Sequence, residues 1–336
     1  MKVAVLGTGI MGSLHAELLA ATDGVDEVLV ADLDPGRAAA AARAAGGRAI
    51  GPEEVWTEAD AVVIATPSEA HAAAVEAAVA AEIPVLCEKP LAGTLTESIR
   101  LTELVESSGA AVQLGFQRRF DAGFAEAHRL VASGELGQLH FLRLTARDPR
   151  IEPNVRDDDE LEAAGLFLHS SVHDFDMARW LSGQEVVELT AIATRRDDPQ
   201  PAVSDLEAAV VTLRLSGGTL AVLEATLLDP AGYDTRAELI GEHDSAAVGL
   251  GPRTPIRRLD PPERPREPWD HYLVRFRDAY AAELAAFLAI ARGERPVPAA
   301  ARDGLEAMRI AVAATISVRE RRSVALAEIP GQAPAV

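Results

Sequence analysis

Short apolar runs and helical patterns alternate through the first 120 residues of the chain. Apolar runs of strand length occupy residues 2–6, 27–31, 61–65, 84–87 and 110–114. Helical patterns lie between them, through Leu14 and Leu18, over residues 37–45, from His71 onward and over residues 97–107. This alternation predicts a parallel, doubly wound sheet with helices on both faces.

The pattern changes after residue 120. A helix is predicted over residues 124–132, and β-like runs follow at 139–145, 186–194, 208–215, 219–227, 237–240 and 246–250. The turn at 216–218 is a hairpin signal, and strands joined by such turns pair antiparallel. Helices are expected at 272–291 and 302–319, an irregular proline-rich loop at 252–268, and fraying from Ile329 onward.

A glycine motif follows the first predicted strand. Gly7, Gly9 and Gly12 have the spacing G-x-G-x-x-G between a strand and a helix. The first glycine permits a tight turn, the second lets a pyrophosphate approach backbone N–H groups, and the third lets helix and strand pack closely. The phosphate would lie at a helix N-terminus, which favours an anion. The motif therefore predicts a Rossmann dinucleotide-binding domain.

Asp32 follows the second predicted strand, 20 residues after Gly12. A carboxylate at this point can accept hydrogen bonds from both hydroxyls of the adenosine ribose, and it repels a 2′-phosphate. Asp32 therefore favours NAD over NADP. Arg37 is the counter-indication, since its guanidinium could pair with that phosphate.

Polar residues follow the third and fourth predicted strands. Thr66 and Pro67 end the third, and Glu88-Lys89-Pro90 follows the fourth, at the sheet edge where ligands bind in such folds. Lys89 is one of only two lysines among 32 basic residues. An ammonium can give up a proton and a guanidinium effectively cannot, which suggests proton transfer at Lys89. His71 is either a cofactor contact or a solvated residue at a helix start.

Two histidines lie close together within residues 165–180. His169 and His173 are four residues apart and Asp176 follows three later, so in a helix the three share one face. The pattern indicates acid–base chemistry or a buried helix whose histidines are satisfied by neighbours. A metal site is a third interpretation, but Ser170 stands where the H-E-x-x-H motif has glutamate.

Composition narrows the function classes. The net charge of −20 argues against nucleic acid or an anionic membrane surface as a partner. The single cysteine, Cys87, excludes an intramolecular disulfide and fits a reducing cytoplasm. The sequence shows neither a cleavable leader nor an apolar run of membrane-spanning length. We expect a soluble, cytoplasmic, globular protein.

Taken together, the motifs resemble those of the glucose–fructose oxidoreductase / inositol dehydrogenase (Gfo/Idh/MocA) family, over about residues 1–325. The resemblance rests on GTGIMG at 7–12, TPSEAH at 66–71, EKP at 88–90, GFQRRFD at 115–121, SSVHDFDMARWL at 170–181 and GYDTRAELIGE at 232–242. The chain looks most like the myo-inositol 2-dehydrogenase branch, with RDP at 147–149 and HDFD at 173–176.

The resemblance implies a fold, a reaction and site residues. The fold class is α/β, with a Rossmann domain at residues 1–118 and, at 119–336, an α+β domain whose open, largely antiparallel sheet packs against another subunit in a homodimer or homotetramer. The reaction is hydride transfer between a sugar or cyclic polyol and a nicotinamide. By position, Lys89 matches the lysine that bonds the reacting hydroxyl, and His173 matches the catalytic histidine. Arg118 and Tyr233 match inositol contacts, and Asp32 matches the ribose-binding acid.

Two positions depart from the inositol enzymes. An aspartate that touches both substrate and lysine is replaced here by His169, and a substrate-contacting histidine is replaced by Ala146. An aspartate would compensate the ammonium of Lys89, whereas an imidazole cannot, so the lysine is expected to lose its proton more readily. His169 can still donate or accept a hydrogen bond, which allows a polyol with a different hydroxyl pattern.

The predicted reaction is NAD-dependent oxidation of a secondary alcohol on an inositol-like polyol or sugar, with His173 as general base and Lys89 stabilising the developing alkoxide. The predicted catalytic residues are Lys89, His173 and His169. The predicted cofactor-binding residues are Gly7, Gly9, Ile10, Met11, Gly12, Asp32, Thr66, Pro67, His71, Glu88 and Lys89. The predicted substrate-binding residues are Gln117, Arg118, Asp148, His169, His173 and Tyr233. No metal site is predicted.

Two alternatives stay open. His169 and Ala146 allow a dehydrogenase for a different substrate, such as a dihydrodiol or an amino sugar. A non-catalytic regulator that senses NAD or a sugar is also compatible with this fold. The presence of both Lys89 and His173 argues against the regulator.

Overall fold

The computed structural model describes residues 1–149, 165–195, 206–249, 269 and 271–331. The chain divides into two compact units. The first comprises Met1–Phe120 and Asp278–Leu305, and the second comprises Asp121–Arg277 and Glu306–Val336. The segment Asp278–Leu305 thus groups with the N-terminal unit, although it lies far along the chain. The division into folding domains at 1–118 and 119–336 stays a prediction, and the predicted loop at 252–268 lies outside the described residues.

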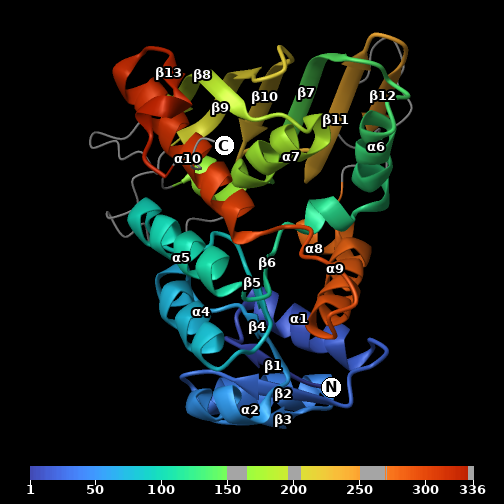
Figure 1. Ribbon diagram of the computed structural model, residues 1–336, viewed down its shortest axis with the longest axis vertical. Coiled ribbons are helices and arrows are strands. Elements are labelled where there is room, and N and C mark those ends of the chain that lie inside the picture. The colour runs from blue at the N-terminus through green and yellow to red at the C-terminus, as the bar shows by residue number, and fades with distance from the viewer. Residues whose placement is uncertain (150–164, 196–205, 250–268, 270, 332–336) are drawn as a thin grey trace. The chain divides into compact units, whose positions relative to one another are not determined.

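The first unit is built on a six-stranded sheet with the order β3-β2-β1-β4-β5-β6 (Figure 1). Its strands are β1 (Lys2–Leu6), β2 (Glu27–Ala31), β3 (Arg48–Ala49), β4 (Ala61–Ile64), β5 (Val85–Cys87) and β6 (Val112–Leu114). Every neighbouring pair is parallel. All residues of β4 and β5 are buried, as expected for parallel strands covered on both faces. The predicted doubly wound sheet is confirmed.

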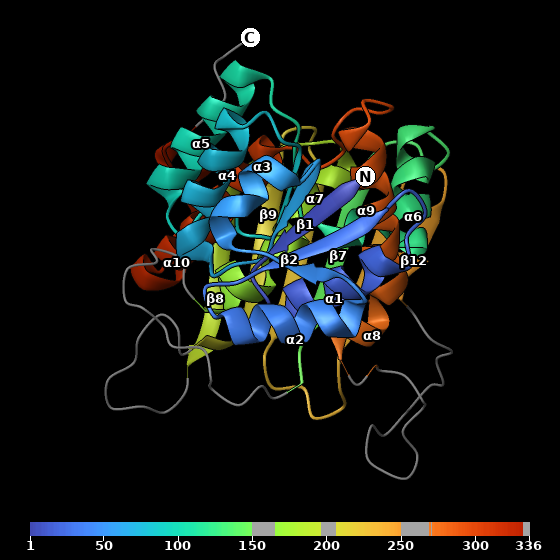
Figure 2. The same ribbon diagram turned by 90° about the horizontal axis from the view of Figure 1, so that it is seen from below.

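Helices cover both faces of this sheet. They are α1 (Ile10–Ala20), α2 (Pro35–Ala45), α3 (Val55–Glu58), α4 (His71–Ala80), α5 (Leu95–Ser108) and most of α9 (Arg277–Ala291), with the 3₁₀ turns η1 (Pro52–Glu54), η2 (Ser68–Ala70) and η3 (Gln117–Phe120). Figure 2 shows α1 and α2 on one face and α4 and α5 on the other. α2 begins earlier than predicted because the Asp34 side chain accepts hydrogen bonds from the N–H groups of Gly36 and Arg37 and so caps the helix.

The second unit contains a seven-stranded sheet with the order β12-β11-β7-β10-β9-β8-β13. Its strands are β7 (Leu139–Arg147), β8 (Val186–Arg195), β9 (Leu206–Leu215), β10 (Leu220–Thr226), β11 (Asp234–Gly241), β12 (Ser245–Val248) and β13 (Val324–Ala325). β7 and β10 pair parallel, and the other neighbours pair antiparallel. The hairpin predicted at 216–218 joins β9 to β10. The prediction of a largely antiparallel sheet is confirmed.

The helical elements of the second unit lie mainly on one face of its sheet (Figure 1). They are α6 (Ala122–Ala132), η4 (Leu166–Ser170), α7 (Val172–Ser182), α8 (Tyr272–Arg275), η6 (Leu326–Glu328) and, from Glu306 onward, α10 (Ala301–Glu320). The opposite face exposes large apolar side chains, among them Ile192, Val210 and Leu220. Among the described residues, every helix is too short or too polar to cross a membrane.

Three local predictions are wrong. The helix expected over 165–180 is a π-helical turn, η4, followed by α7, and the N–H of Ser171 donates to the carbonyl of Leu166, five residues back. The helix expected over 272–291 breaks at the buried Phe276. The prediction of fraying is wrong at Ile329, because its side chain is buried and its carbonyl accepts a hydrogen bond from Arg309. Residues 332–336 of that tail lie outside the described residues.

Candidate active site

The three glycines of the first turn have different surroundings. Gly7 has a φ of +94°, and a Cβ there would lie 2.6 Å from the carbonyl oxygen of Ala65. A Cβ on Gly12 would lie 1.9 Å from the carbonyl oxygen of Gly7. A Cβ on Gly9 would have no heavy atom within 4 Å. Gly7 and Gly12 are therefore required by packing, whereas Gly9 borders open space that a ligand could enter.

The N-terminus of α1 suits a phosphate group. The N-cap residue is Gly9, which has no side chain that could accept hydrogen bonds from the first N–H groups of the helix. The first turn also carries no acidic residue. The N–H groups at this end are thus offered to an anion without a competing carboxylate. Ile10, the first residue of the helix, is 65% exposed and Met11 is half-buried, so both are accessible beside this end.

Asp32 lies at the carboxyl end of β2, next to the glycine turn. Its Oδ2 accepts hydrogen bonds from the Thr8 N–H at 2.8 Å and the Thr8 hydroxyl at 2.6 Å, and its Oδ1 accepts one from the Asp34 N–H at 2.9 Å. Burial opposes ionisation, but these bonds and the nearby Arg37 guanidinium outweigh it and lower the pKa of Asp32. Asp32 is therefore an anion at neutral pH, as a ribose acceptor should be. Arg37 lies 4.0 Å from Oδ2.

His71 ties two strand ends together. Its Nε2 lies 2.9 Å from the carbonyl oxygen of Thr66, after β4, and its Nδ1 lies 2.7 Å from that of Pro90, after β5. The residue is 1% exposed, so the interpretation as a solvated helix-start residue is wrong. Burial lowers the pKa of His71, against the opposing effect of the two carbonyl contacts and the charge of Glu88. The imidazole bridges the Thr66-Pro67 loop and the loop that carries Lys89.

Glu88 points into the first unit. Its Oε1 lies 2.7 Å from Nε2 of His15, on α1, and its Oε2 accepts a hydrogen bond from the Lys89 N–H at 3.3 Å. Its side chain is only 10% exposed, whereas Lys89 is half-buried. No sequence motif points to His15, because an isolated histidine inside a helix carries no spacing signal.

Gln117 and Arg118 belong to η3, just after β6, and are 3% and 2% exposed. Because the strands are parallel, this turn lies at the same sheet edge as the glycine turn, Asp32 and Lys89. The structure thus brings the predicted cofactor-binding residues together with Lys89, Gln117 and Arg118 at one edge of the first unit.

The remaining predicted residues belong to the second unit. His169 lies in η4 and His173 in the first turn of α7, and both are half-buried. Asp174 and Asp176 are almost completely buried, at 1% and 0% exposed. The predicted single helical face for His169, His173 and Asp176 is therefore wrong, since a π-turn separates the two histidines and the carboxylate is packed inside.

Asp148 is linked to the π-turn. The Ser170 hydroxyl donates a 2.7 Å hydrogen bond to Oδ2 of Asp148. The Asp148 backbone is held on both sides, since its N–H donates to Thr226 and its carbonyl accepts from Asp229. A rigid strand end therefore supports the turn that carries His169. Ala146, two residues earlier, is 2% exposed and lies within β7.

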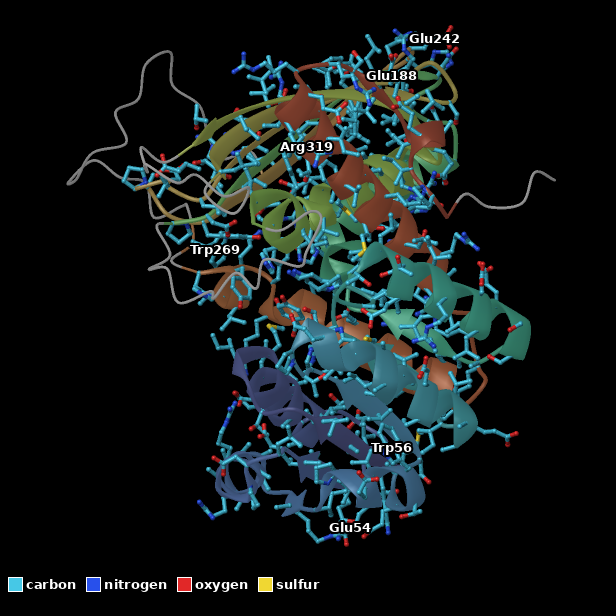
Figure 3. The ribbon with its side chains drawn as sticks, turned by 90° about the vertical axis from the view of Figure 1, so that its left-hand side faces the viewer. Glu54, Trp56, Glu188, Glu242, Trp269 and Arg319 are labelled. Atoms are coloured by element: carbon cyan, nitrogen blue, oxygen red, sulfur yellow. The ribbon has the colours of Figure 1, made fainter. Side chains whose placement is uncertain are left out.

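Tyr233 lies in an aromatic cluster. Its ring centroid is 6.2 Å from that of Tyr272 and 6.1 Å from that of Phe276. Its backbone exchanges hydrogen bonds with Trp269, whose N–H donates to Tyr233 at 3.1 Å and whose carbonyl accepts from Tyr233 at 2.8 Å. Trp269, labelled in Figure 3, is 41% exposed. The pairing places an accessible indole beside a predicted substrate residue.

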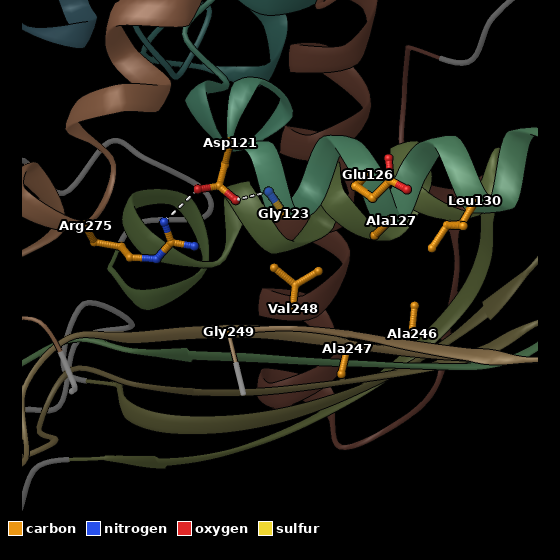
Figure 4. Close-up of a pocket in the computed structure, with 10 residues that line it drawn as sticks. All are labelled: Asp121, Gly123, Glu126, Ala127, Leu130, Ala246, Ala247, Val248, Gly249 and Arg275. Atoms are coloured by element: carbon orange, nitrogen blue, oxygen red, sulfur yellow. Dashed lines mark hydrogen bonds and ion pairs between the residues drawn. The ribbon is translucent and has the colours of Figure 1, made fainter. Parts of the chain in front are cut away.

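A pocket of about 450 Å³ lies elsewhere in the second unit, between α6 and β12. Figure 4 shows the Asp121–Arg275 ion pair at one end and Val248 on the strand side. Its described lining includes none of the predicted site residues. Within the described ranges, no three His, Cys, Asp or Glu side chains are grouped to hold a metal ion, so the metal interpretation of His169, His173 and Asp176 gains no support.

Most of the chain is similar to known oxidoreductases. A family described as oxidoreductases with an NAD-binding Rossmann fold matches residues 1–116, and the GFO/IDH/MocA C-terminal domain matches residues 124–247. A myo-inositol dehydrogenase of Streptomyces leeuwenhoekii is 37% identical over 322 residues, which cover 94% of this chain and 96% of that protein.

Solved structures agree with the fold. A probable dehydrogenase from Thermotoga maritima superposes with a TM-score of 0.87 at 31% identity, covering 98% of this chain and 100% of that one. A myo-inositol dehydrogenase from Lactobacillus casei, in complex with NAD(H) and myo-inositol, superposes with a TM-score of 0.83 at 26% identity, covering 97% and 96%.

Proposed function

Because the chain belongs to the GFO/IDH/MocA family of oxidoreductases, we propose that it is an NAD-dependent dehydrogenase that oxidises a secondary alcohol of inositol or a related cyclic polyol. The family predicted from the sequence motifs is confirmed. The observation that carries the proposal is the similarity to a myo-inositol dehydrogenase over 94% of the chain. That enzyme's substrate class is the first to test here.

The first unit fits NAD at the edge of its parallel sheet. The open side of Gly9 and the uncapped N-terminus of α1 would hold the pyrophosphate. The Asp32 carboxylate would accept the ribose hydroxyls, and the exposed side chain of Ile10 would contact the cofactor. When bound, NAD supplies the hydride acceptor of the reaction.

We assign the acid–base chemistry to Lys89 and His173. His173 takes the proton of the reacting hydroxyl as general base, and the positive charge of Lys89 stabilises the alkoxide that develops. Both side chains are half-buried. Gln117, Arg118 and Tyr233 contribute to polyol binding, and Asp148 supports the His169 turn through Ser170.

His169 determines which polyol the site accepts. An imidazole presents one donor and one acceptor in its neutral form, whereas the aspartate of the inositol enzymes presents acceptors only. The set of hydroxyl groups that can bind is thereby changed. A cyclic polyol other than myo-inositol is accordingly included in the test.

The test is NAD reduction across myo-inositol, scyllo-inositol, aldoses and dihydrodiols, with the wild type, His169→Asp and Lys89→Arg in parallel. Turnover of an inositol by the wild type supports the proposal, and Lys89→Arg should then lower kcat by about 100-fold or more. Turnover of myo-inositol by His169→Asp alone would mean a different natural substrate. NAD binding without turnover of any compound would favour the sensing regulator.

We further propose that the open face of the second sheet packs against a second copy of the chain. The exposed side chains of Val187, Ile192, Val210, Leu220 and Ile240 support this, since exposed apolar residues on one sheet face mark contact sites. The strand register puts Ile192 opposite Val210, and Leu220 opposite Arg214. Arg214 pairs with Glu188, labelled in Figure 3, so the face combines apolar and charged groups, as subunit interfaces do.

A further inference from the structure

Two carboxyl groups and an imidazole are buried close together in the first unit. Glu283, on α9, and His15, on α1, are both 0% exposed, and Glu88 is 8% exposed. The ring of His15 meets that of Tyr280 edge-on at 5.9 Å, and Tyr280 lies one turn before Glu283 on α9. The cluster thus joins α1, the end of β5 and α9, three elements far apart in the sequence.

The two carboxyl groups carry different charges. Burial opposes ionisation of Glu88, but the hydrogen bond and charge of His15, together with the charges of Lys89 and His71, outweigh it and lower the pKa of Glu88. Burial, and then the negative charge of Glu88, raise the pKa of Glu283 well above its usual value. Two buried carboxylates near one another cannot both ionise easily. Glu88 is therefore the anion and Glu283 the neutral acid.

Hydrogen bonding agrees with this assignment. Both carboxyl oxygens of Glu283 and Nδ1 of His15 are buried, and neither residue shows a hydrogen-bond partner at these atoms within the described part of the chain. Burying an ionised Glu283 in that environment would cost far more free energy than burying a neutral one. A neutral acid held at a position with no ion partner destabilises the fold slightly, and such groups concentrate at functional sites.

The cluster bears directly on Lys89. Oε2 of Glu88 accepts a hydrogen bond from the backbone N–H of Lys89 at 3.3 Å, and the charge of Lys89 contributes to lowering the pKa of Glu88. Gly115 leaves room for the same oxygen, because a Cβ at position 115 would come within 2.9 Å of it. His15 holds the other oxygen at 2.7 Å. Both oxygens of Glu88 are therefore held by hydrogen-bond partners, His15 and the Lys89 backbone.

Several titratable groups surround Glu88. Those that face it or its partners are His15 from α1, His71 from α4, Glu69 through His71, Tyr280 and Glu283 from α9, and Cys87 and Lys89 from its own segment. Burial raises the pKa of the Cys87 thiol, which stays neutral. Within the cluster of Glu88, His15 and Glu283, the negative charge therefore lies on Glu88.

We propose that Glu88, His15 and Glu283 form a positioning cluster for Lys89, in which Glu88 provides a negative charge next to Lys89 and Glu283 stores one proton. This inference rests on the proposed function in one respect, since Lys89 must act in the reaction for its position to matter. His15 orients Glu88 by donating from Nε2, because an ionised carboxylate can only accept. As long as Glu283 is protonated it is neutral, so Glu88 is the charged carboxylate of the cluster.

The charge state of Glu283 is tested without any substrate. Its pKa is raised in the folded state, so its contribution to stability is complete below about pH 4.5 and declines as the pH rises towards the folded pKa. Thermal unfolding of the full chain is followed from pH 5 to pH 9 for the wild type, Glu283→Gln and the matched control Asp278→Asn, an exposed residue of the same helix. The Tm of the wild type should fall relative to Glu283→Gln as the pH rises, while Asp278→Asn follows the wild type. A constant difference between wild type and Glu283→Gln would overturn the assignment.

The positioning role is tested by the pH dependence of kcat/KM for the best polyol. Glu88→Gln removes the negative charge of Glu88 next to Lys89, so the limb of the profile that reports Lys89 should move by about one pH unit or more to lower pH. His15→Gln, which keeps a donor, should retain a profile nearer to that of the wild type than His15→Leu does. An unmoved limb in Glu88→Gln, with folding intact, would overturn the role. If the wild type oxidises no polyol, the proposed function fails, while the unfolding experiment still decides the proton on Glu283.

Discussion

The residues around the cofactor edge differ in whether the protein or the ligand requires them. Gly12 is required by the protein, because any side chain would overlap the carbonyl of Gly7. Gly9 has a φ of −66°, which alanine adopts without strain, and nothing within 4 Å of a Cβ. Only a bound ligand would make Gly9 necessary. The two positions can therefore be separated by experiment.

Gly9→Ala should leave the Tm of the protein unchanged and weaken NAD binding by about tenfold or more, roughly 1.4 kcal/mol. Gly12→Ala should lower the free energy of unfolding by about 3 kcal/mol, because the backbone must move to admit the methyl group. Thermal unfolding and NAD titration of both variants give the comparison. If Gly9→Ala unfolded as readily as Gly12→Ala, the ligand would not be the reason for the glycine.

Asp32 and Arg37 set the choice between NAD and NADP. Asp32→Ser should lower kcat/KM with NAD by about tenfold or more and raise the preference for NADP, because the repulsion of the 2′-phosphate is removed. Arg37, only 4.0 Å from the carboxylate, is placed to pair with that phosphate. In the double variant Asp32→Ser/Arg37→Gln, kcat/KM with NAD should stay low. The preference for NADP gained in Asp32→Ser should disappear. An unchanged cofactor ratio in Asp32→Ser would contradict the assignment.

At the scale of the elements, the strands with the strongest hydrophobic patterns were predicted correctly. The runs at 2–6 and 27–31 coincide with β1 and β2, because each is a continuous apolar segment bounded by turn residues. The register of the second sheet and the return of α9 to the first unit depend on contacts between distant residues. No local pattern specifies such contacts.

The interruption between η4 and α7 illustrates what the sequence leaves open. A π-turn and an α-turn differ by one residue per hydrogen bond, and the apolar residues Leu166, Phe167 and Leu168 are compatible with either. The motifs single out Lys89 and His173, because both stand in recognisable segments. Their roles in the reaction stay a prediction. The residues that hold the site from behind could not be predicted. Ser170 and His15 belong to no motif whose spacing would single them out.

The support of the π-turn gives a prediction with an adjacent control. Ser170→Ala removes the 2.7 Å hydrogen bond to Asp148, at a cost of about 1–3 kcal/mol to the arrangement of the turn. It should lower kcat/KM for the polyol by about tenfold and leave the KM for NAD unchanged. Ser171→Ala removes a buried hydroxyl that has no hydrogen-bond partner in the described part of the chain, so it should behave like the wild type. Equal losses in both variants would contradict the role of Ser170.

At the scale of the whole molecule, the open sheet face predicts the oligomeric state. Ile192 is 74% exposed and faces its cross-strand neighbour Val210, which is 47% exposed. Burying a charge at this position without a partner costs several kcal/mol, so Ile192→Glu should shift the protein to smaller assemblies. Light scattering after size-exclusion chromatography measures the mass. Val274→Glu, on the exposed side of α8, is the matched control and should leave the mass unchanged. A wild type that is monomeric at micromolar concentration would contradict the interface.

The central claim is that the chain transfers a hydride from a polyol carbon to NAD. The most direct measurement uses myo-inositol and scyllo-inositol carrying deuterium on the ring carbons, with mass spectrometry of the nicotinamide product. With the wild-type protein, we expect one deuterium in the reduced cofactor for each ketone formed. With Lys89→Arg or without protein, we expect deuterated cofactor to form at a much lower rate. Reduced cofactor without deuterium, or no reduced cofactor with any deuterated polyol despite NAD binding, would contradict it.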